Sequence, residues 1–470
     1  MNCRVYGVQA KWRIIMLGIT VGEIAEATGG KIIFGNKNDK IESIMTDSRK
    51  ADRSSLFIPF KGERADGHEF IGKAFENGAC AALTEKEIGA VDGKSAILVE
   101  NTQLALGMIA KYYKKKFRVK TVAVTGSVGK TTTKDMLYAV MNMQYCTLKT
   151  EGNYNNEIGL PLTVMKLNGA HEAVVLEMGM SAFGEIHYLA DIARPDVAII
   201  TNIGMSHIEN LGSQEGIYKA KTEICDFFDK NSLLIVNGDD EFLKKTKSFN
   251  KFKVVTCGMG GDCDYRAENV VDMGLDGSAF DVCFYGRKYS IRVKVPGIHN
   301  VYNALAAIAC GVHYNIGPNQ IISGIENFVM TDMRMSVINT GKLTLINDCY
   351  NASPDSVKAA LKVLSNRKER KAAVLGDMLE LGEYSEKAHY DLGKEVFSNG
   401  IDILITAGEN ARNIAKGARE SGVKNIVSFA NTDELCDNIK SYIQDGDCVL
   451  IKASRGMHFE KITTKLTEQD

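Results

Sequence analysis

Short apolar runs, separated by polar or helix-patterned stretches, fill the chain after residue 118. The first set reads VKTVAVT, AVVLEM, DVAIIT, SLLIVN and FKVVTC, runs that are rich in β-branched residues and too short for helices. Strands of this kind that alternate with helices predict a largely parallel sheet covered by helices on both faces. The stretch HNVYNALAAIACGVHY at 299–314 predicts one long apolar helix.

A second alternation begins near residue 335 with LTLIND, KAAVLGD, DILITAG, NIVSFA and DCVLIKAS, and it predicts a doubly wound α/β domain. The segment before residue 118 differs, because it mixes patterns: ITVGEIAEATGG has helical spacing and a glycine stop, whereas SLFIPF and SAILVE are typical of strands. The charged run KYYKKKFR at 111–118 is typical of a solvated helix end and marks a boundary. We therefore predict domains at 16–117, 118–332 and 333–470, with 1–15 as a leader of unknown role.

Composition narrows the class of protein. The 470 residues are 45% apolar and 24% charged with a formal net charge of −1, so nothing favours nucleic acid or an anionic membrane as a partner. No uncharged apolar run reaches the roughly 18 residues of a transmembrane helix, and the N-terminal stretch lacks the apolar core of a signal peptide. The 11 cysteines include no C-x-x-C pair, which favours free thiols in a reducing cytoplasm over disulfides or zinc.

The clearest chemical signal is VTGSVGKTTT at 124–133. Val124 occupies the position of the first glycine in the standard phosphate-loop pattern G-x-x-x-x-G-K-[ST]. A four-residue turn nevertheless separates a predicted strand from a helix-patterned stretch, and it consists of Gly126, Ser127, Val128 and Gly129. Such a turn directs backbone N–H groups at an anion, while Lys130 can reach the β- and γ-phosphates and Thr131 can ligate Mg²⁺. A strain-relieving turn is the alternative, but the Gly-Lys-Thr-Thr sequence favours a shortened nucleotide loop.

A GTPase is disfavoured, because its base-reading N-K-x-D should follow the loop. The chain has NKND only at 36–39, well before the loop, where a polar turn explains it better.

Other polar residues follow predicted strands, at the edge where open α/β sheets bind ligands. Glu177 could hold Mg²⁺ on phosphates or could cap a helix, and Asp348 could accept hydrogen bonds from a ribose. His207 lies in a loop, where a lone histidine is usually solvated or satisfied within the core. The asparagines of TEGNYNNEIGLP could contact a polar substrate or only form turns. Lys219 and Lys221 by themselves indicate a solvated helix face.

The order of these motifs resembles that of the Mur ligase superfamily. The matching pieces cover nearly all of the chain after residue 16 and are TDSR, TGSVGKTTTKD, GNYNNEIGLP, EMGM, TNIGMSHIENLGS, YKAKTEI, GIHNVYNALAA, NDCYNASP and GDMLELGEYSEKAH. They are most similar to the member that adds D-alanyl-D-alanine. The D-N-P-R motif usual in the member that adds the third amino acid is absent from the sequence.

The resemblance implies an α/β protein of three domains: a small α/β N-terminal domain for a UDP-sugar, a central P-loop-type ATPase domain with a mostly parallel sheet, and a C-terminal Rossmann-like domain for the incoming amino component. It implies a cytoplasmic, monomeric, ATP- and Mg²⁺-dependent ligase of peptidoglycan precursor synthesis. ATP would phosphorylate the carboxylate of UDP-MurNAc-tripeptide, and the amine of D-Ala-D-Ala would attack the acyl phosphate.

The resemblance also implies roles for individual residues. Lys130 would stabilise the transferring phosphoryl group, and two Mg²⁺ ions would be held by Thr131, Glu177, His207 and a carbamylated Lys221. Further ATP contacts are implied for loop residues 126–129, Thr132, Asn300, Asn303, Arg334 and Asp348. Substrate contacts are implied for Asp47, Ser48 and Arg49 toward UDP, for Asn153 and Asn156, and for Asn351, Ser353 and Pro354 toward the dipeptide.

Three positions depart from the family pattern: relatives often carry glycine at Met333, asparagine at Ser353 and glycine at Ala453. Two rival hypotheses stay open from the sequence. One is another Mur-type ligase, such as a folylpolyglutamate-forming or third-residue-adding enzyme. The other is a nucleotide-binding regulatory module without ligase turnover.

Overall fold

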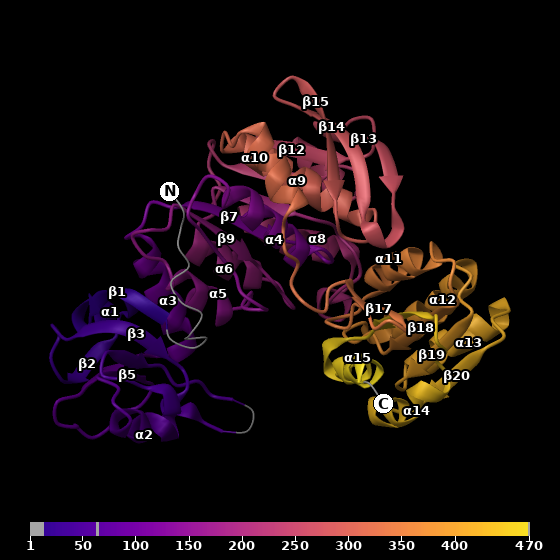
Figure 1. Ribbon diagram of the computed structural model, residues 1–470. Helices are drawn as coiled ribbons and strands as arrows, with labels where there is room; N and C mark the ends of the chain where they lie inside the picture. The colour runs from indigo at the N-terminus through magenta and orange to yellow at the C-terminus, as the bar shows by residue number, and fades with distance from the viewer. Residues whose placement is uncertain (1–13, 63–64, 469–470) are drawn as a thin grey trace.

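The computed structural model describes residues 14–62 and 65–468, so the predicted leader at 1–15 lies almost entirely outside the described residues. Within the described part, the strands form three sheets that follow one another along the chain. The central region lies at the top of Figure 1, and the N-terminal and C-terminal regions lie below it on opposite sides. The predicted α/β fold with three sheet-containing regions is confirmed.

The N-terminal sheet is mixed. Its six strands lie in the order β1 (Ile14–Thr20), β3 (Lys40–Met45), β4 (Ser55–Phe57), β5 (Ala81–Thr84), β6 (Ser95–Leu98) and β2 (Lys31–Phe34). Its helices are α1 (Val21–Thr28), α2 (Ile71–Glu76) and α3 (Thr102–Lys114). Strands β3 to β6 run parallel, so their carboxyl ends meet at one edge of the sheet. The glycine stop predicted after α1 is confirmed, because Gly29 caps the helix with a φ of 64°.

The central sheet has nine strands in the order β15 (Arg287–Val293), β14 (Ser278–Phe284), β13 (Tyr265–Asp272), β12 (Lys253–Gly258), β11 (Leu233–Asn237), β10 (Val197–Ile200), β7 (Lys120–Thr125), β9 (Ala173–Glu177) and β8 (Thr147–Lys149). The part from β12 to β8 is parallel, as predicted. The antiparallel strands β13 to β15 were not predicted. More buried and more exposed positions alternate along these strands. They therefore lack the continuous apolar runs from which the parallel strands were predicted.

Helices cover both faces of the central sheet (Figure 1). They are α4 (Lys130–Met141), α5 (Gly159–Val164), α6 (Glu185–Ala193), α7 (Ile208–Leu211), α8 (Gln214–Thr222), α9 (His299–His313) and α10 (Pro318–Glu326). Side chains of β7 alternate between two cores: Val122 and Val124 pack in the core that includes Leu305 of α9, whereas Ala123 packs in the core that includes Leu189 of α6. A continuous apolar run is therefore required, because both faces of the strand are buried.

The C-terminal sheet is parallel apart from its first strand. Its order is β16 (Ser336–Asn339), β17 (Thr344–Asn347), β21 (Cys448–Lys452), β18 (Lys371–Gly376), β19 (Ile403–Ala407) and β20 (Ile426–Phe429). Its helices are α11 (Pro354–Ser365), α12 (Ser385–Ser398), α13 (Ala411–Ser421), α14 (Thr432–Asn438) and α15 (Glu460–Thr467). All five apolar runs predicted in this region form strands. Across residues 14–62 and 65–468, no helix has the length and apolar character needed to span a membrane.

Glu23 joins the first helix to the end of α3. Its Oε2 accepts a hydrogen bond from the Thr20 backbone N–H at 2.7 Å, and Thr20 Oγ1 accepts one from the Glu23 N–H at 3.1 Å, which completes a capping box. Its Oε1 accepts bonds from Tyr112 Oη at 2.9 Å and from Lys116 Nζ at 2.8 Å. The hydrogen bond from Lys116 is the main cause that lowers the pKa of Glu23 to about 2.

We expect Glu23→Gln to lower the free energy of unfolding at pH 7 by about 1 kcal/mol. Because the folded-state pKa is depressed, the stabilisation is fully present above about pH 4.5 and is lost as the pH falls toward about 2. Thermal unfolding of both proteins at pH 7 and in acid measures this, with the exposed Glu26→Gln of the same helix as the control. A variant with the same pH profile as wild type would contradict it.

Candidate active site

One cavity of about 420 Å³ gathers most of the residues singled out in the sequence. From the central domain it is lined by loop residues 127–132, Asn153, Asn156, Glu177, His207, Asn300 and Asn303. From the C-terminal domain it is lined by Arg334, Asp348, Asn351 and Ser353. The cavity therefore lies between these two domains, at the carboxyl edge of the central sheet.

The loop between β7 and α4 is held in a fixed turn by the end of β10. Gly126 has a φ of 148°, and a Cβ there would lie 1.8 Å from Thr201 Oγ1, so no larger residue fits. Val128 N–H donates to Asn202 Oδ1 at 2.9 Å, and Thr201 Oγ1 donates to the Val128 carbonyl at 2.6 Å. Helix α4 begins directly after the turn, with Gly129 as its N-cap. The predicted strand–turn–helix context is confirmed.

Lys130 and Glu177 both line the cavity beside this turn. Lys130 Nζ donates to the Gly126 carbonyl at 2.8 Å, and burial lowers the pKa of its ammonium while the charge of Glu177 opposes that shift. Glu177 ends β9 with only 2% of its surface exposed. Its Oε1 accepts a hydrogen bond from Asn155 Nδ2 at 2.8 Å, whereas its buried Oε2 has no hydrogen-bond partner in the described residues. The ammonium of the buried Lys134 lies 3.9 Å from this oxygen, so a cation of the protein already lies near it.

His207 and the two candidate lysines follow β10. His207 Nδ1 lies 2.6 Å from Glu380 Oε2 of the C-terminal domain, and this contact is the main cause that lowers the pKa of Glu380. On α8, Lys219 is exposed, whereas Lys221 is 1% exposed and does not line the cavity. Burial lowers the pKa of Lys221 well below its usual value, and the charge of Lys130 lowers it further. The helix therefore turns Lys221, and not Lys219, toward the interior.

Arg334 reaches the phosphate loop from the C-terminal side. Its Nη2 donates to Thr131 Oγ1 at 3.3 Å, and its guanidinium carbon lies 3.9 Å from the centre of the Tyr350 ring. Met333 and Met335 on either side have φ angles of 60° and 51°. A non-glycine residue in this left-handed region costs about 1 kcal/mol. The turn that presents Arg334 is thus strained.

Asp348 holds that strained turn in place. Its Oδ1 accepts a hydrogen bond from the Met335 N–H at 3.1 Å. Its Oδ2 forms a short ion pair with the buried Lys452, which also donates to the Asn351 carbonyl at 2.9 Å. Both carboxylate oxygens of Asp348 therefore already have protein partners.

Asn300 and Asn303 lie in the first turns of α9 and are buried. Asn303 Nδ2 donates to Asn300 Oδ1 at 2.9 Å, and Thr133 Oγ1 of α4 donates to Asn303 Oδ1 at 3.0 Å. The pair therefore fixes α9 against the helix that follows the phosphate loop. Pro354 starts α11 after the N-cap Ser353 and does not line the cavity.

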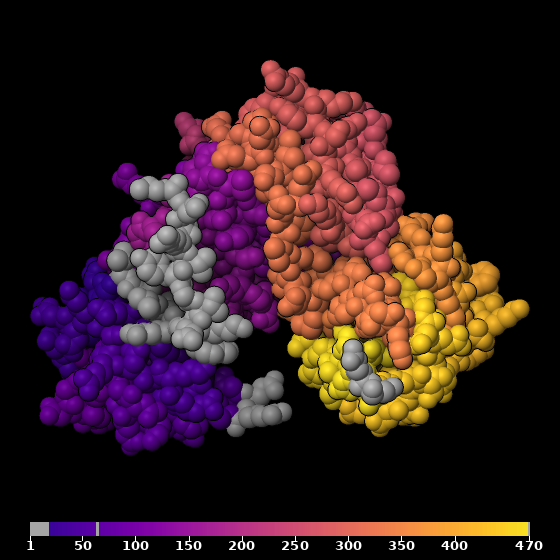
Figure 2. Space-filling view, in the orientation of Figure 1, coloured from indigo at the N-terminus to yellow at the C-terminus, as the bar shows by residue number. Residues whose placement is uncertain are grey.

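The predicted UDP motif lies elsewhere, at the carboxyl edge of the N-terminal sheet. Asp47 accepts hydrogen bonds from Arg49 Nε at 2.9 Å and Nη2 at 2.8 Å, which lowers the pKa of Asp47 to about 2, and Ser48 is buried beside it. The Arg49 side chain is 84% exposed. These residues do not line the central cavity, and Figure 2 shows open space between the N-terminal and C-terminal regions.

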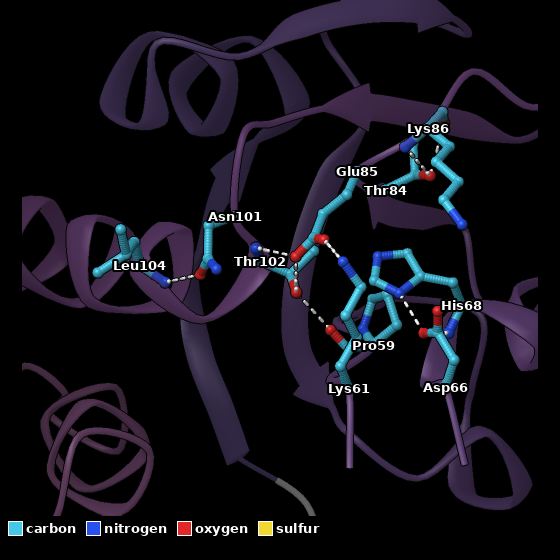
Figure 3. Close-up of polar contacts among 10 residues, drawn as sticks. All are labelled: Pro59, Lys61, Asp66, His68, Thr84, Glu85, Lys86, Asn101, Thr102 and Leu104. Carbon is cyan, nitrogen blue, oxygen red and sulfur yellow. Dashed lines mark hydrogen bonds and ion pairs between the residues drawn. The ribbon is translucent and has the colours of Figure 1, made fainter. Parts of the chain in front are cut away.

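Figure 3 shows the polar residues along the same edge. Glu85 follows β5, accepts a hydrogen bond from the Thr102 N–H at 3.0 Å and pairs with Lys61. Asp66 Oδ1 lies 2.6 Å from His68 Nδ1. The Glu85 contact ties the start of α3 to the loop after β4, so this cluster has a structural role.

Comparisons with known proteins match all three regions to one family. Residues 40–114, 124–311 and 333–455 match the models described as "Mur ligase family, catalytic domain", "Mur ligase middle domain" and "Mur ligase, glutamate ligase domain". The chain is also 41% identical over 96% of its length to UDP-N-acetylmuramoyl-tripeptide–D-alanyl-D-alanine ligase of Bacillus subtilis, covering 99% of that protein. This chain belongs to the Mur ligase family.

Solved structures of other Mur ligases have the same architecture. MurF from Acinetobacter baumannii superposes with a TM-score of 0.89 at 30% identity, over 97% of this chain and 100% of that one. MurF from Thermotoga maritima, solved in complex with ADP, superposes with a TM-score of 0.81 at 28% identity, over 90% and 96% of the two chains. These likenesses extend over the whole three-domain Mur ligase fold.

Several residues of this Mur ligase site were not predicted. Asn155 contacts Glu177 directly, although it belongs to the same sequence cluster as Asn153 and Asn156. Glu380 and Lys452 contact site residues from the C-terminal domain. Glu380 lies in the family-like stretch GDMLELGEYSEKAH, which begins at the last residue of β18, and Lys452 is the last residue of β21. Their place at the carboxyl ends of strands was the sequence signal that could have identified them as site residues.

Proposed function

We propose that this Mur ligase joins D-alanyl-D-alanine to UDP-N-acetylmuramoyl-tripeptide with consumption of ATP, and releases ADP and phosphate. The similarity to the Bacillus subtilis ligase of that specificity and the ADP bound to the Thermotoga maritima relative support it. The observation that carries the proposal is the shared cavity. Its phosphate loop comes from the central domain, whereas Arg334, Asp348 and Asn351 come from the C-terminal domain, so nucleotide and amine can meet there.

The arrangement suits formation of an acyl phosphate. A carboxylate that attacks a polyphosphate meets strong charge repulsion, so catalysis consists mainly of positioning and charge neutralisation. Lys130 and Arg334 bring positive charge from two sides of the loop. The amine of the dipeptide then attacks the acyl carbon, and phosphate leaves as the amide bond forms.

We propose that Thr131, Glu177, His207 and Lys221 hold two Mg²⁺ ions. Thr131, Glu177 and His207 all line the cavity beside the phosphate loop, and a carboxylate and a hydroxyl are oxygen ligands of the kind that Mg²⁺ prefers, which supports this proposal. The bound ions would neutralise phosphate charge. A plain ammonium at Lys221 would repel them, whereas its carbamate would supply an anionic oxygen. Carbamylation needs an uncharged amine, and the strongly lowered pKa of Lys221 favours that form.

The remaining contacts follow from the family resemblance. Position in the cavity also supports those of the asparagines, Asp348 and Ser353, but not those of Pro354 and the UDP motif. We propose that Asn300 and Asn303 lie near the adenine and that Asp348 lies near the ribose. Asp47, Ser48 and Arg49 would contact UDP, and Asn153 and Asn156 the rest of that substrate. Asn351, Ser353 and Pro354 would form the dipeptide pocket. We expect the enzyme to act as a monomer in the cytoplasm, where ATP is available.

The decisive test is phosphate release from ATP, with UDP-MurNAc-tripeptide and D-Ala-D-Ala each supplied alone and then together. We expect fast release only when both are present, because an acyl phosphate without its amine acceptor does not turn over. If ATP hydrolysis did not depend on either substrate, the ligase function would be wrong, and the nucleotide-binding module without ligase turnover would be the remaining hypothesis.

A further inference from the structure

The linker between the central and C-terminal domains is fixed at one buried carboxylate. Asp135 lies on α4, and its side chain is fully buried. Its Oδ2 accepts two hydrogen bonds from Thr331, one from the backbone N–H at 3.1 Å and one from Oγ1 at 2.8 Å. Thr331 lies after α10, the last helix before the C-terminal sheet, and before β16, the first strand of that sheet.

The charge of Asp135 is balanced within the central domain. Its Oδ1 accepts a hydrogen bond from Lys149 Nζ of β8 at 2.7 Å and lies 3.5 Å from Lys134 Nζ. Lys134 Nζ is in turn 3.9 Å from Glu177 Oε2. A buried ionised carboxylate with this many donors is a strong and directional acceptor. We call Asp135, Lys149 and Thr331 the linker anchor.

The linker anchor lies one helical turn from the contact that Arg334 makes with the phosphate loop. Thr131 and Asp135 are four residues apart on α4, so their side chains share a face at a rise of about 6 Å. Thr331 and Arg334 are three positions apart in the chain, a reach of at most about 10 Å. The linker is therefore held at two neighbouring points of one helix.

We propose that Asp135 is a positioning residue that sets where the linker leaves the central domain, and thereby delivers Arg334 to the phosphate loop. Without the linker anchor, the linker would leave the central domain from a range of positions, and the turn at Met333 and Met335 would keep its contact with Asp348 but lose its fixed position relative to α4. The residue acts through Arg334 and does not touch substrate. This inference rests on the proposed ligase function.

The sharpest test replaces Thr331, the linker residue of this contact. Replacing Asp135 itself, as in Asp135→Asn, would leave the buried lysines without their charged partner. Thr331→Val keeps the shape and removes the hydroxyl, whereas Thr331→Ser keeps the hydroxyl. We expect Thr331→Val to lower the kcat of substrate-dependent phosphate release about 10-fold, the loss expected for one hydrogen bond to a charged group. The KM for UDP-MurNAc-tripeptide should stay unchanged, since the proposed UDP contacts Asp47 and Arg49 lie in the N-terminal domain. Thr331→Ser should retain wild-type kcat.

Thr340→Val is the matched control, because the Thr340 hydroxyl is hydrogen-bonded in the β16–β17 turn, away from the linker. Hydrogen exchange of the peptide that contains Thr331 gives a readout independent of turnover, and this peptide should exchange faster in Thr331→Val than in Thr331→Ser or wild type. Wild-type kcat in Thr331→Val, equal losses in the Val and Ser variants, or unchanged exchange would each overturn the inference. If the wild-type enzyme showed no substrate-dependent phosphate release, the proposed function would be wrong. The hydrogen-exchange result would still test whether the linker anchor fixes the linker.

Discussion

Replacing Lys130 by methionine should reduce substrate-dependent phosphate release by about 10³-fold, the scale of removing a cation from a phosphoryl-transfer site. In the structure its ammonium donates to the carbonyl of Gly126, within the loop that would surround the phosphates. Methionine keeps most of the length of the side chain and removes the charge. The variant should fold normally, because within the described part of the chain the Lys130 ammonium donates hydrogen bonds only to carbonyls of its own loop.

The control for this prediction is Lys130→Arg. It keeps the charge, but a planar guanidinium replaces a compact ammonium in a tight turn, so we expect a rate between those of wild type and Lys130→Met. Affinity for the UDP-linked substrate should be retained in both variants, because Asp47 and Arg49 lie in another domain. If Lys130→Met kept a tenth or more of the wild-type rate, the loop would not be the phosphate site.

Replacing Lys221 by alanine should lower the same rate by about 10²-fold or more. The side chain is buried on α8, and burial lowers its pKa well below the usual value, which leaves the amine free to take up CO₂. If the carbamate supplies an oxygen to Mg²⁺, then formate or acetate should partly restore the rate of Lys221→Ala. Rates measured with and without added carboxylate test this directly.

Lys219→Ala is the matched control, because Lys219 lies two residues away on the same helix with its side chain exposed. It should have wild-type activity. The rate of wild-type enzyme should also fall in acid, where the amine of Lys221 becomes protonated and cannot carry CO₂. Equal losses for the two lysine variants, or an unchanged rate in Lys221→Ala, would remove the carbamate proposal.

Much of the fold follows from local pattern. A strand buried on both faces must be apolar throughout, so β7, β9 and β10 are visible as runs in the sequence. The phosphate loop is equally local, because its glycines, Lys130 and Thr131 are consecutive and lie between a strand and a helix. Strands β13 to β15 escaped prediction, because their solvated positions interrupt the apolar signal.

The sequence by itself thus determined the α/β class, the three regions, the loop and, through the order of its motifs, the family. Only the tertiary structure decided which lysine of α8 faces inward, which asparagine contacts Glu177, and how Arg334 reaches Thr131. Asp135 and Thr331 are 196 positions apart, and no periodicity links them. Such contacts depend on the order in which strands join the sheet and on how two domains meet, and both are set by packing over the whole chain.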